Sequence, residues 1–218
     1  MVSNTVIFDM DGLLIDSEPL WGEAATEIFG GYNFQLSKAQ YATTTGMRTK
    51  EFVEWWFNHH KIDARHNAIA ENAILQSVVN KVAAKGKALP GVEHIFNFFI
   101  ERHFKIGLAT SSGKPLIDVV VDKLGIRKYL QAIESAAALP CGKPHPQVYL
   151  NCAAALSSHP TQCICFEDSF NGLIAAKAAR MKCVVVPAPQ DSKNVKFNAA
   201  DLKISSLTNF NSLLLQTL

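Results

Sequence analysis

Short apolar runs that each stop at polar residues recur along the chain. The first is Thr5-Val6-Ile7-Phe8, which ends at Asp9. Later runs of the same form occupy residues 106–109, 132–133, 164–166 and 184–186. Runs of this length, bounded by polar residues and in part β-branched, predict short buried β-strands.

Helical patterns separate these runs. They extend over residues 91–102, 115–124, 146–156 and 171–181. Alternation of strand and helix predicts an α/β fold, a Rossmann-like parallel sheet with helices on both faces. In such a sheet ligands gather at the carboxyl ends of the strands, where the polar residues stand.

The segment from residue 16 to residue 85 interrupts the alternation. It contains three helical patterns, at 18–29, 49–60 and 65–85, and no convincing strand. An insert of this size directly after the first strand predicts two domains. We expect an α/β core formed by residues 1–15 and 86–218, and a helical cap formed by residues 16–85.

Composition narrows the class of protein. The 218 residues are 48% hydrophobic and 18% charged, and the net charge is +2, which excludes a disordered polymer and gives no sign of nucleic-acid or membrane binding. No apolar stretch approaches the ~18 residues of a membrane span, and acids stand near the amino terminus, where a signal peptide is apolar. The five cysteines are an odd number, so we expect buried thiols. These features predict a cytoplasmic protein.

Acidic residues follow two of the predicted strands. Asp9 and Asp11, with Gly12, come after the first strand, and Glu167 and Asp168 come after the run at 164–166. Each turn alone has an ordinary interpretation, an acidic turn for the first and a helix N-cap for Asp168. Parallel strands, however, bring both turns to one edge of the sheet, where clustered carboxylates need a cation. Hard oxygen ligands suit Mg²⁺, which also accepts a substrate phosphate.

Other polar residues fit a phosphate site at the same edge. Lys143 is a candidate counter-charge for the acids, although a single lysine is usually a surface charge. Thr110 and Ser111 follow the strand at 106–109 and offer hydroxyl and N–H donors, although they also suit plain helix capping. Motifs for nucleotide-binding loops, dinucleotide binding, serine hydrolases and zinc proteases are absent from the sequence.

Four signatures therefore follow strands in order: Asp9-x-Asp11-Gly12 with Asp16, then Thr110, Lys143-Pro144, and Glu167-Asp168. Together they resemble the haloacid dehalogenase superfamily over essentially the whole chain. The helical insert resembles the cap of its β-phosphoglucomutase-like branch. The stretches 9–21, 143–150 and 184–189 are similar to the bacterial hexitol phosphatase and 2-deoxyglucose-6-phosphate phosphatase group.

This resemblance implies a Mg²⁺-dependent phosphatase of small sugar or sugar-alcohol phosphates. Asp9 is the implied nucleophile and Asp11 the acid and base. Lys143 and Thr110 are expected to hold the phosphoryl oxygens, with Ser111 beside them. The Mg²⁺ ligands are expected to be Asp9, the Asp11 backbone carbonyl and Asp168, with Glu167 assisting.

Substrate specificity is expected in the cap. Arg48, on a loop before a predicted helix, either touches substrate or is an ordinary solvated side chain. Trp21 is a second candidate, and it stands where the related mutases carry a histidine, which favours hydrolysis. A hexose-phosphate mutase and a non-catalytic sugar-phosphate sensor remain the alternatives, and we expect a monomer that binds neither nucleic acid nor a membrane.

Overall fold

The computed structural model describes residues 3–218, so the first two residues of the predicted core segment 1–15 lie outside the described residues. Its centre is a parallel sheet in the order β3-β2-β1-β4-β5-β6. The strands are β1 (Thr5–Phe8), β2 (Lys105–Thr110), β3 (Ala132–Ser135), β4 (Cys163–Glu167), β5 (Lys182–Val185) and β6 (Leu202–Lys203). The five predicted strands are confirmed. The prediction missed β6, because two residues at a sheet edge give no apolar pattern.

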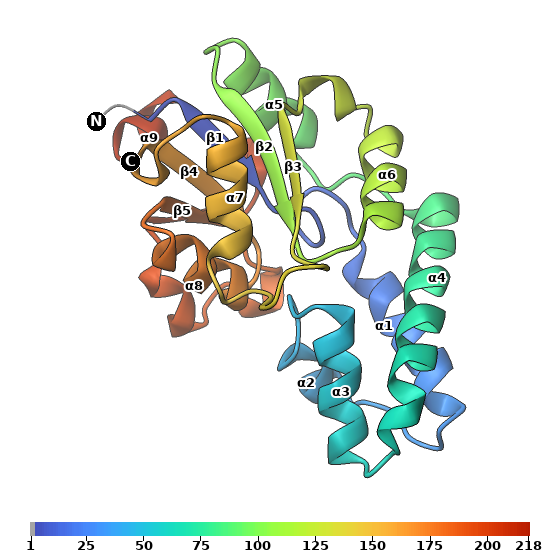
Figure 1. The fold of residues 1–218 in the computed structure, drawn as a ribbon. Coiled ribbons are helices and arrows are strands. Elements are labelled where there is room, and N and C mark those ends of the chain that lie inside the picture. Colours follow the sequence, from blue (N-terminus) through green and yellow to red (C-terminus); the bar gives the residue numbers. More distant parts are fainter. Residues whose placement is uncertain (1–2) are drawn as a thin grey trace.

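Helices cover both faces of the sheet, as predicted (Figure 1). Because neighbouring strand residues point to opposite faces, Phe8 stacks on Phe96 at a centroid distance of 5.0 Å, whereas Ile7 joins the cluster that contains Tyr149. The flanking helices are α5 (Val92–Ile100), α6 (Lys114–Lys123), α7 (Gln147–Ala155), α8 (Phe170–Ala178) and α9 (Ser212–Gln216). The helix predicted to end at residue 181 ends three residues earlier, where Ala179 caps α8 and the chain turns at Arg180 with a φ of 64°.

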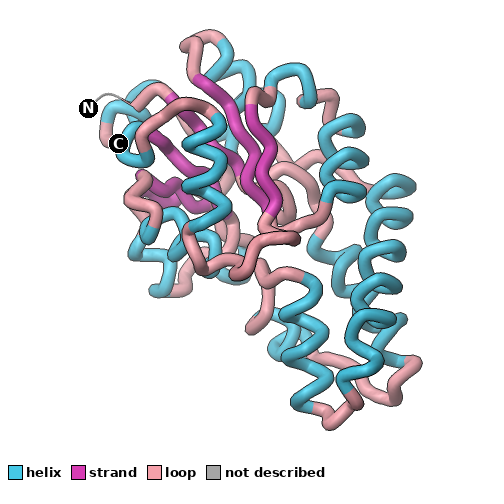
Figure 2. The backbone as a smooth tube through the Cα atoms, viewed as in Figure 1, coloured by secondary structure: helices cyan, strands magenta, loops and turns pink. Residues whose placement is uncertain are grey.

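The remaining helices form a group on one side of the sheet (Figures 1 and 2). They are α1 (Glu18–Gly30), α2 (Lys38–Ala42), α3 (Thr49–His59) and α4 (Asn67–Lys85). Residues 16–85 are called the insert below. The prediction missed α2, a five-residue helix that begins with a Ser37–Gln40 capping box. It also began the last helix too early, because Asp63 caps a separate 3₁₀ turn at residues 64–66.

The two connections between insert and sheet run side by side. Ile15 and Ala88 form an isolated antiparallel bridge, and the Asp16 N–H donates to the Lys87 carbonyl at 2.9 Å. The predicted boundaries at residues 15 and 86 lie at this paired connection. Further 3₁₀ helices are Arg127–Tyr129, Pro160–Gln162, Pro189–Asp191, Val195–Ala199 and Leu207–Asn209.

The cysteine prediction was right for four thiols. Cys152, Cys163, Cys165 and Cys183 are buried, but Cys141 is exposed because it lies on the loop between β3 and α7. Burial raises the pKa of Cys152 well above its ordinary value, which keeps this thiol protonated and unreactive at neutral pH. Across residues 3–218, every helix is too short or too polar to cross a membrane.

Candidate active site

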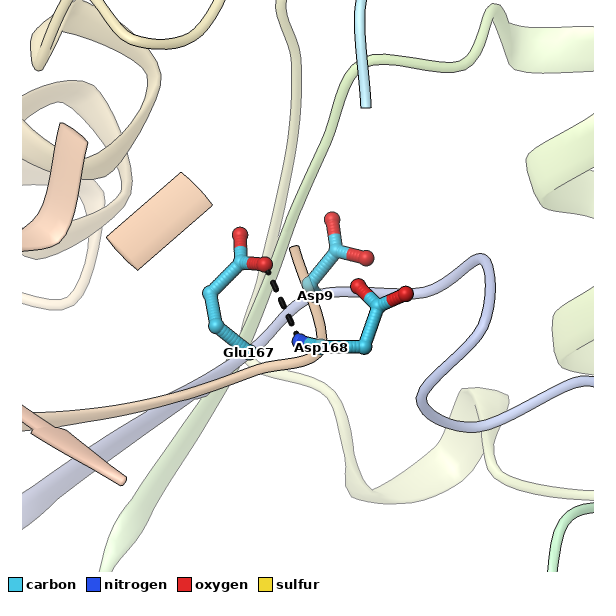
Figure 3. A group of neighbouring side chains, drawn as sticks. All are labelled: Asp9, Glu167 and Asp168. Carbon is cyan, nitrogen blue, oxygen red and sulfur yellow. Dashed lines mark hydrogen bonds between the residues drawn. The ribbon is translucent and has the colours of Figure 1, made fainter. Parts of the chain in front are cut away.

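Three carboxylates meet where β1 and β4 end. Asp9 directly follows β1, Glu167 is the last residue of β4, and Asp168 comes next. Strands β1 and β4 are paired in register, which brings their carboxyl ends together. One oxygen from each carboxylate lies within 4.8 Å of the others (Figure 3). The expected meeting of acids at this edge is therefore confirmed.

Lys143 inserts its ammonium group into this acidic cluster. The Nζ donates to Asp9 Oδ1 and to Glu167 Oε1, each at 2.6 Å, and to the Ala109 carbonyl at 3.0 Å. Burial alone lowers the pKa of Lys143, but the two carboxylates outweigh burial and raise it. The side chain is only 1% exposed and stays charged, so the expected counter-charge is present.

Glu167 serves as a structural anchor within the cluster. Its Oε1 accepts from Lys143 and from the Tyr149 hydroxyl at 2.5 Å, while its Oε2 accepts from the Asp168 N–H at 3.2 Å. Figure 3 shows the Glu167 carboxylate on the opposite side of the Asp168 nitrogen from the Asp9 and Asp168 carboxylates. Gly172 makes room for it, because a Cβ there would lie 1.8 Å from Glu167 Oε1.

The cluster has more negative than positive charge. Burial raises the pKa of Asp9 to about 8, opposed by Lys143 and supported by Glu167 and Asp11. The pKa of Asp168 is also raised well above its ordinary value, first by burial and then by Asp9 and Glu167. A divalent cation between Asp9 and Asp168 favours both charged forms, and carboxylate oxygens are the ligands that Mg²⁺ prefers. The donor set therefore fits this ion.

Asp11 is held apart from the acidic cluster by three donors. Its Oδ1 accepts from Ser17 Oγ at 2.6 Å and from Trp21 Nε1 at 3.1 Å, and its Oδ2 accepts from Ser112 Oγ at 2.7 Å. Gly12, with a φ of 75°, turns the chain between Asp11 and the insert. Asp11 therefore faces the same space as Asp9 with a fixed carboxylate orientation.

These groups surround a small inner cavity of about 60 Å³. It is lined by Asp9, Asp11, Trp21, Thr110, Ser111, Lys143 and Asp168 of the predicted set, together with residues 44–47 of the insert. Thr110 is buried and its Oγ1 accepts from the Ser112 N–H at 3.1 Å, whereas Ser111 Oγ donates to the Gly46 carbonyl at 3.1 Å.

Arg48 lies outside the residues that line this cavity. Its guanidinium donates to the carbonyls of Ala136 at 3.2 Å, of Leu139, and of Pro140 at 3.3 Å, and to Glu51 Oε1 at 2.6 Å. The side chain is buried, so the solvated alternative is wrong. Contact with substrate stays a prediction, and in this structure Arg48 instead joins the insert to the loop that precedes Lys143.

Sequence reasoning missed several neighbours of the predicted residues. Ser17 and Ser112 adjoin Asp16 and Ser111, so their places beside known motif residues were an available signal. Tyr149 follows Lys143 by six residues, but only the packing of α7 onto the sheet reveals its bond to Glu167. Glu18 and Tyr41, which also line the inner cavity, carried no sequence signal of their own.

Comparison with known proteins agrees with this geometry. A family model described as haloacid dehalogenase-like hydrolase matches residues 6–186. Hexitol phosphatase B of Escherichia coli is 38% identical over 203 residues, which are 93% of this chain and 91% of that protein. Fructose-1-phosphate phosphatase YqaB of Escherichia coli is 30% identical over 181 residues, covering 83% and 95%. The crystal structure of β-phosphoglucomutase from Clostridium difficile superposes with a TM-score of 0.87 at 22% identity, covering 99% and 96%.

Proposed function

The chain belongs to the haloacid dehalogenase-like hydrolase family, and from this membership we propose that it is a Mg²⁺-dependent phosphatase of small sugar or sugar-alcohol phosphates. The observation that carries the proposal is the 2.6 Å contact between Lys143 and Asp9, beside an acidic cluster and opposite Asp11. A nucleophile, a counter-charge and a second carboxylate thus face one cavity, which a pure sensor does not need.

Asp9 is the nucleophile in this proposal. A carboxylate oxygen of Asp9 attacks phosphorus, the bond from phosphorus to the leaving alcohol breaks, and an aspartyl-phosphate forms. Asp11 gives a proton to the leaving alcohol and later takes one from the water that hydrolyses the aspartyl-phosphate. The donors Ser17, Trp21 and Ser112 support this role, because they fix the direction of the Asp11 carboxylate.

Mg²⁺ would be held by Asp9, Asp168 and the Asp11 backbone carbonyl. Glu167 assists from behind, because both its oxygens already accept hydrogen bonds. When bound, the ion neutralises phosphoryl charge and so reduces the repulsion between the phosphate and Asp9. Lys143, Thr110 and Ser111 bind the phosphoryl oxygens, and positioning with charge neutralisation supplies most of the acceleration.

The insert acts as a cap that closes over the substrate and excludes bulk water. Its residues 44–47 and Trp21 support this assignment, because they line the cavity opposite the core residues. Hexitol phosphatase B is the relative whose name supports a hexitol phosphate as the substrate class, and the deoxyhexose 6-phosphate alternative follows from the sequence resemblance.

The test measures phosphate release from a panel of sugar, sugar-alcohol and nucleotide monophosphates, with Mg²⁺ and with EDTA. We expect metal-dependent release from hexitol or deoxyhexose phosphates, and its loss in Asp9→Asn. Asp122→Asn, which changes an exposed aspartate on α6, is the matched control and should retain activity. Isomerised product without free phosphate would instead identify a mutase, and sugar-phosphate binding without turnover would identify a sensor.

A further inference from the structure

Arg48 lies beside the site without forming part of its surface. It stands at the start of α3, directly after residues 44–47, which line the inner cavity. Arg48 lines neither that cavity nor the larger cleft between α1, α2 and the core. The residue is only 8% exposed, and it bonds to the loop between β3 and α7 instead. Its task is therefore to be found in that loop.

The Arg48 guanidinium holds the loop by its backbone. It donates to the carbonyls of Ala136 at 3.2 Å, of Leu139, and of Pro140 at 3.3 Å. A guanidinium is a planar fork with five donors, so one side chain binds several carbonyls at once. These bonds fix the path of the backbone and leave the side chains of the loop free to vary.

Glu51, one turn further along α3, completes this contact. Its Oε1 accepts from Arg48 at 2.6 Å and from the Gly142 N–H at 3.5 Å. Gly142 is packed against both residues, because a Cβ there would lie 2.7 Å from Arg48 Nε and 2.9 Å from Glu51 Oε2. Within residues 3–218, every hydrogen bond that joins residues 138–142 to another element ends on Arg48 or Glu51. The insert thus provides the hydrogen bonds that hold this stretch in place.

Lys143 comes directly after this stretch. Its Nζ donates to Asp9 Oδ1 and to Glu167 Oε1, each at 2.6 Å. A displacement of residues 138–142 shifts the Lys143 backbone and with it the ammonium group. Misplacement of a reacting or positioning group by about 1 Å can lower a rate about 100-fold. The position of Lys143 is therefore determined by the acids at one end of its side chain and by the insert at the other.

We propose that Arg48 is a positioning residue that acts through the loop between β3 and α7. When the insert is closed on the core, Arg48 and Glu51 hold this loop and so place the Lys143 ammonium beside Asp9 and the phosphoryl oxygens. When the insert opens, the loop loses these bonds and the nucleophile loses its fixed counter-charge. The inference rests on the proposed function, and it makes turnover depend on closure even for a substrate that never touches Arg48.

The experiment loosens the contact from each side. Arg48→Lys removes the planar fork from the insert, and Gly142→Ala places a methyl group against Arg48 and Glu51 from the core. We measure kcat and KM with a hexitol 6-phosphate and with acetyl phosphate, whose short leaving group does not reach Arg48. Arg65→Lys, at an exposed arginine of the insert, and Gly30→Ala, where a Cβ meets nothing within 4 Å, are the matched controls.

We expect each variant to lower kcat at least about tenfold with both substrates, since Lys143 faces the same phosphoryl charge in each. The fall should appear in kcat more than in KM, because a positioned charge acts mainly on the transition state. The double variant should lie within about twofold of the slower single variant, because both changes release the same loop. The controls should keep the kinetics of the parent.

A loss confined to the hexitol phosphate would show that Arg48 contacts the substrate, and a loss in Arg48→Lys alone would show that it does not act through the loop. Either result overturns the inference, as does an unchanged kcat in both variants. Thermal unfolding shows which variants are folded at the assay temperature, and if one is not, the other decides. A parent enzyme that hydrolyses neither substrate would refute the proposed function and this inference with it.

Discussion

The carboxylate cluster and the seam between insert and core are held together in different ways. In the cluster, the ionisable side chains of Asp9 and Glu167 both accept hydrogen bonds from the Lys143 ammonium group. At the contacts of the insert with the loops that follow β2, β3 and β4, called the seam here, side chains of one part bond to the backbone of the other, as Asn171 Nδ2 does to the Thr45 carbonyl at 3.2 Å. A carbonyl is present at every residue, so the seam depends on the identity of one partner only.

This difference teaches where substitutions should matter. Removing one member of a buried charged cluster leaves the others charged and unpaired, and the penalty of burying them then appears in full. Removing a donor at the seam leaves carbonyls without a partner, which is a smaller penalty. The cluster should therefore be much less tolerant of change than the seam.

The largest expected effect comes from Lys143→Met. The variant keeps an unbranched side chain that is one atom shorter, but it leaves Asp9 and Glu167 without their ammonium partner. We expect about 3–5 kcal/mol lower free energy of unfolding at pH 7, together with loss of phosphatase activity. Chemical denaturation measures the first and phosphate release the second.

Lys177→Met is the matched control for this change. Lys177 also forms a 2.6 Å ion pair, with Asp201, but at the surface, where its side chain is 36% exposed. We expect a loss of about 0–1 kcal/mol there. Similar losses for both variants would contradict the view that the cluster is held by its buried charges.

The same difference explains which parts of the site could be predicted from the sequence. Asp9, Glu167 and Asp168 were predictable because they are acids at the carboxyl ends of strands, and the strands themselves follow from apolar runs. Lys143 lies on the loop between β3 and α7, and its place in the order of the motifs made it predictable. The parallel α/β pattern implies only that these acids lie at one edge of the sheet, and the β1–β4 pairing that places Asp9 beside Glu167 is known from the structure.

The seam and the α2 helix were not predictable in the same way. Arg48 donates to backbone carbonyls nearly ninety positions further along the chain, and no side chain marks those positions. The α2 helix has five residues and no buried one, so it has no apolar periodicity to detect. The sequence pattern indicates only that Tyr149 is a core residue, and the structure confirms this. Its hydrogen bond to Glu167 depends on tertiary packing.

A smaller effect is expected from Arg48→Lys at the seam. A lysine keeps the charge but loses the planar fork that reaches several carbonyls at once. We expect a loss of about 1–2 kcal/mol in the free energy of unfolding and faster amide hydrogen exchange in residues 136–142. Arg65→Lys, at an arginine that is 76% exposed beside Asp63, should leave both unchanged. A loss as large as that of Lys143→Met would remove the distinction between seam and cluster.

The smallest expected effect concerns Glu18, a carboxylate at the start of α1 that lines the inner cavity. Burial, then Asp11 and Asp16, raise its pKa from 4.5 to about 7, and none of the described residues donates a hydrogen bond or forms an ion pair with it. Since the folded protein holds this proton more tightly than the unfolded chain, stability from Glu18 is complete below pH 4.5 and is lost as pH rises to 7. The free energy of unfolding should therefore fall between pH 4.5 and pH 7, and we expect Glu18→Gln to reduce this fall by about 1 kcal/mol. Chemical denaturation at the two pH values, with EDTA present, measures it.

Glu23→Gln on the same helix provides the opposite sign. A hydrogen bond from Lys85 lowers the pKa of Glu23, so its contribution is present above its ordinary value of 4.5 and is lost as pH falls further. Its replacement should therefore leave the decline between pH 4.5 and 7 unchanged. If Glu18→Gln also leaves the fall in free energy of unfolding between pH 4.5 and pH 7 unchanged, the Glu18 carboxylate has an ordinary pKa in the folded protein. The unfavourable burial of charge is then confined to the cluster at the ends of β1 and β4.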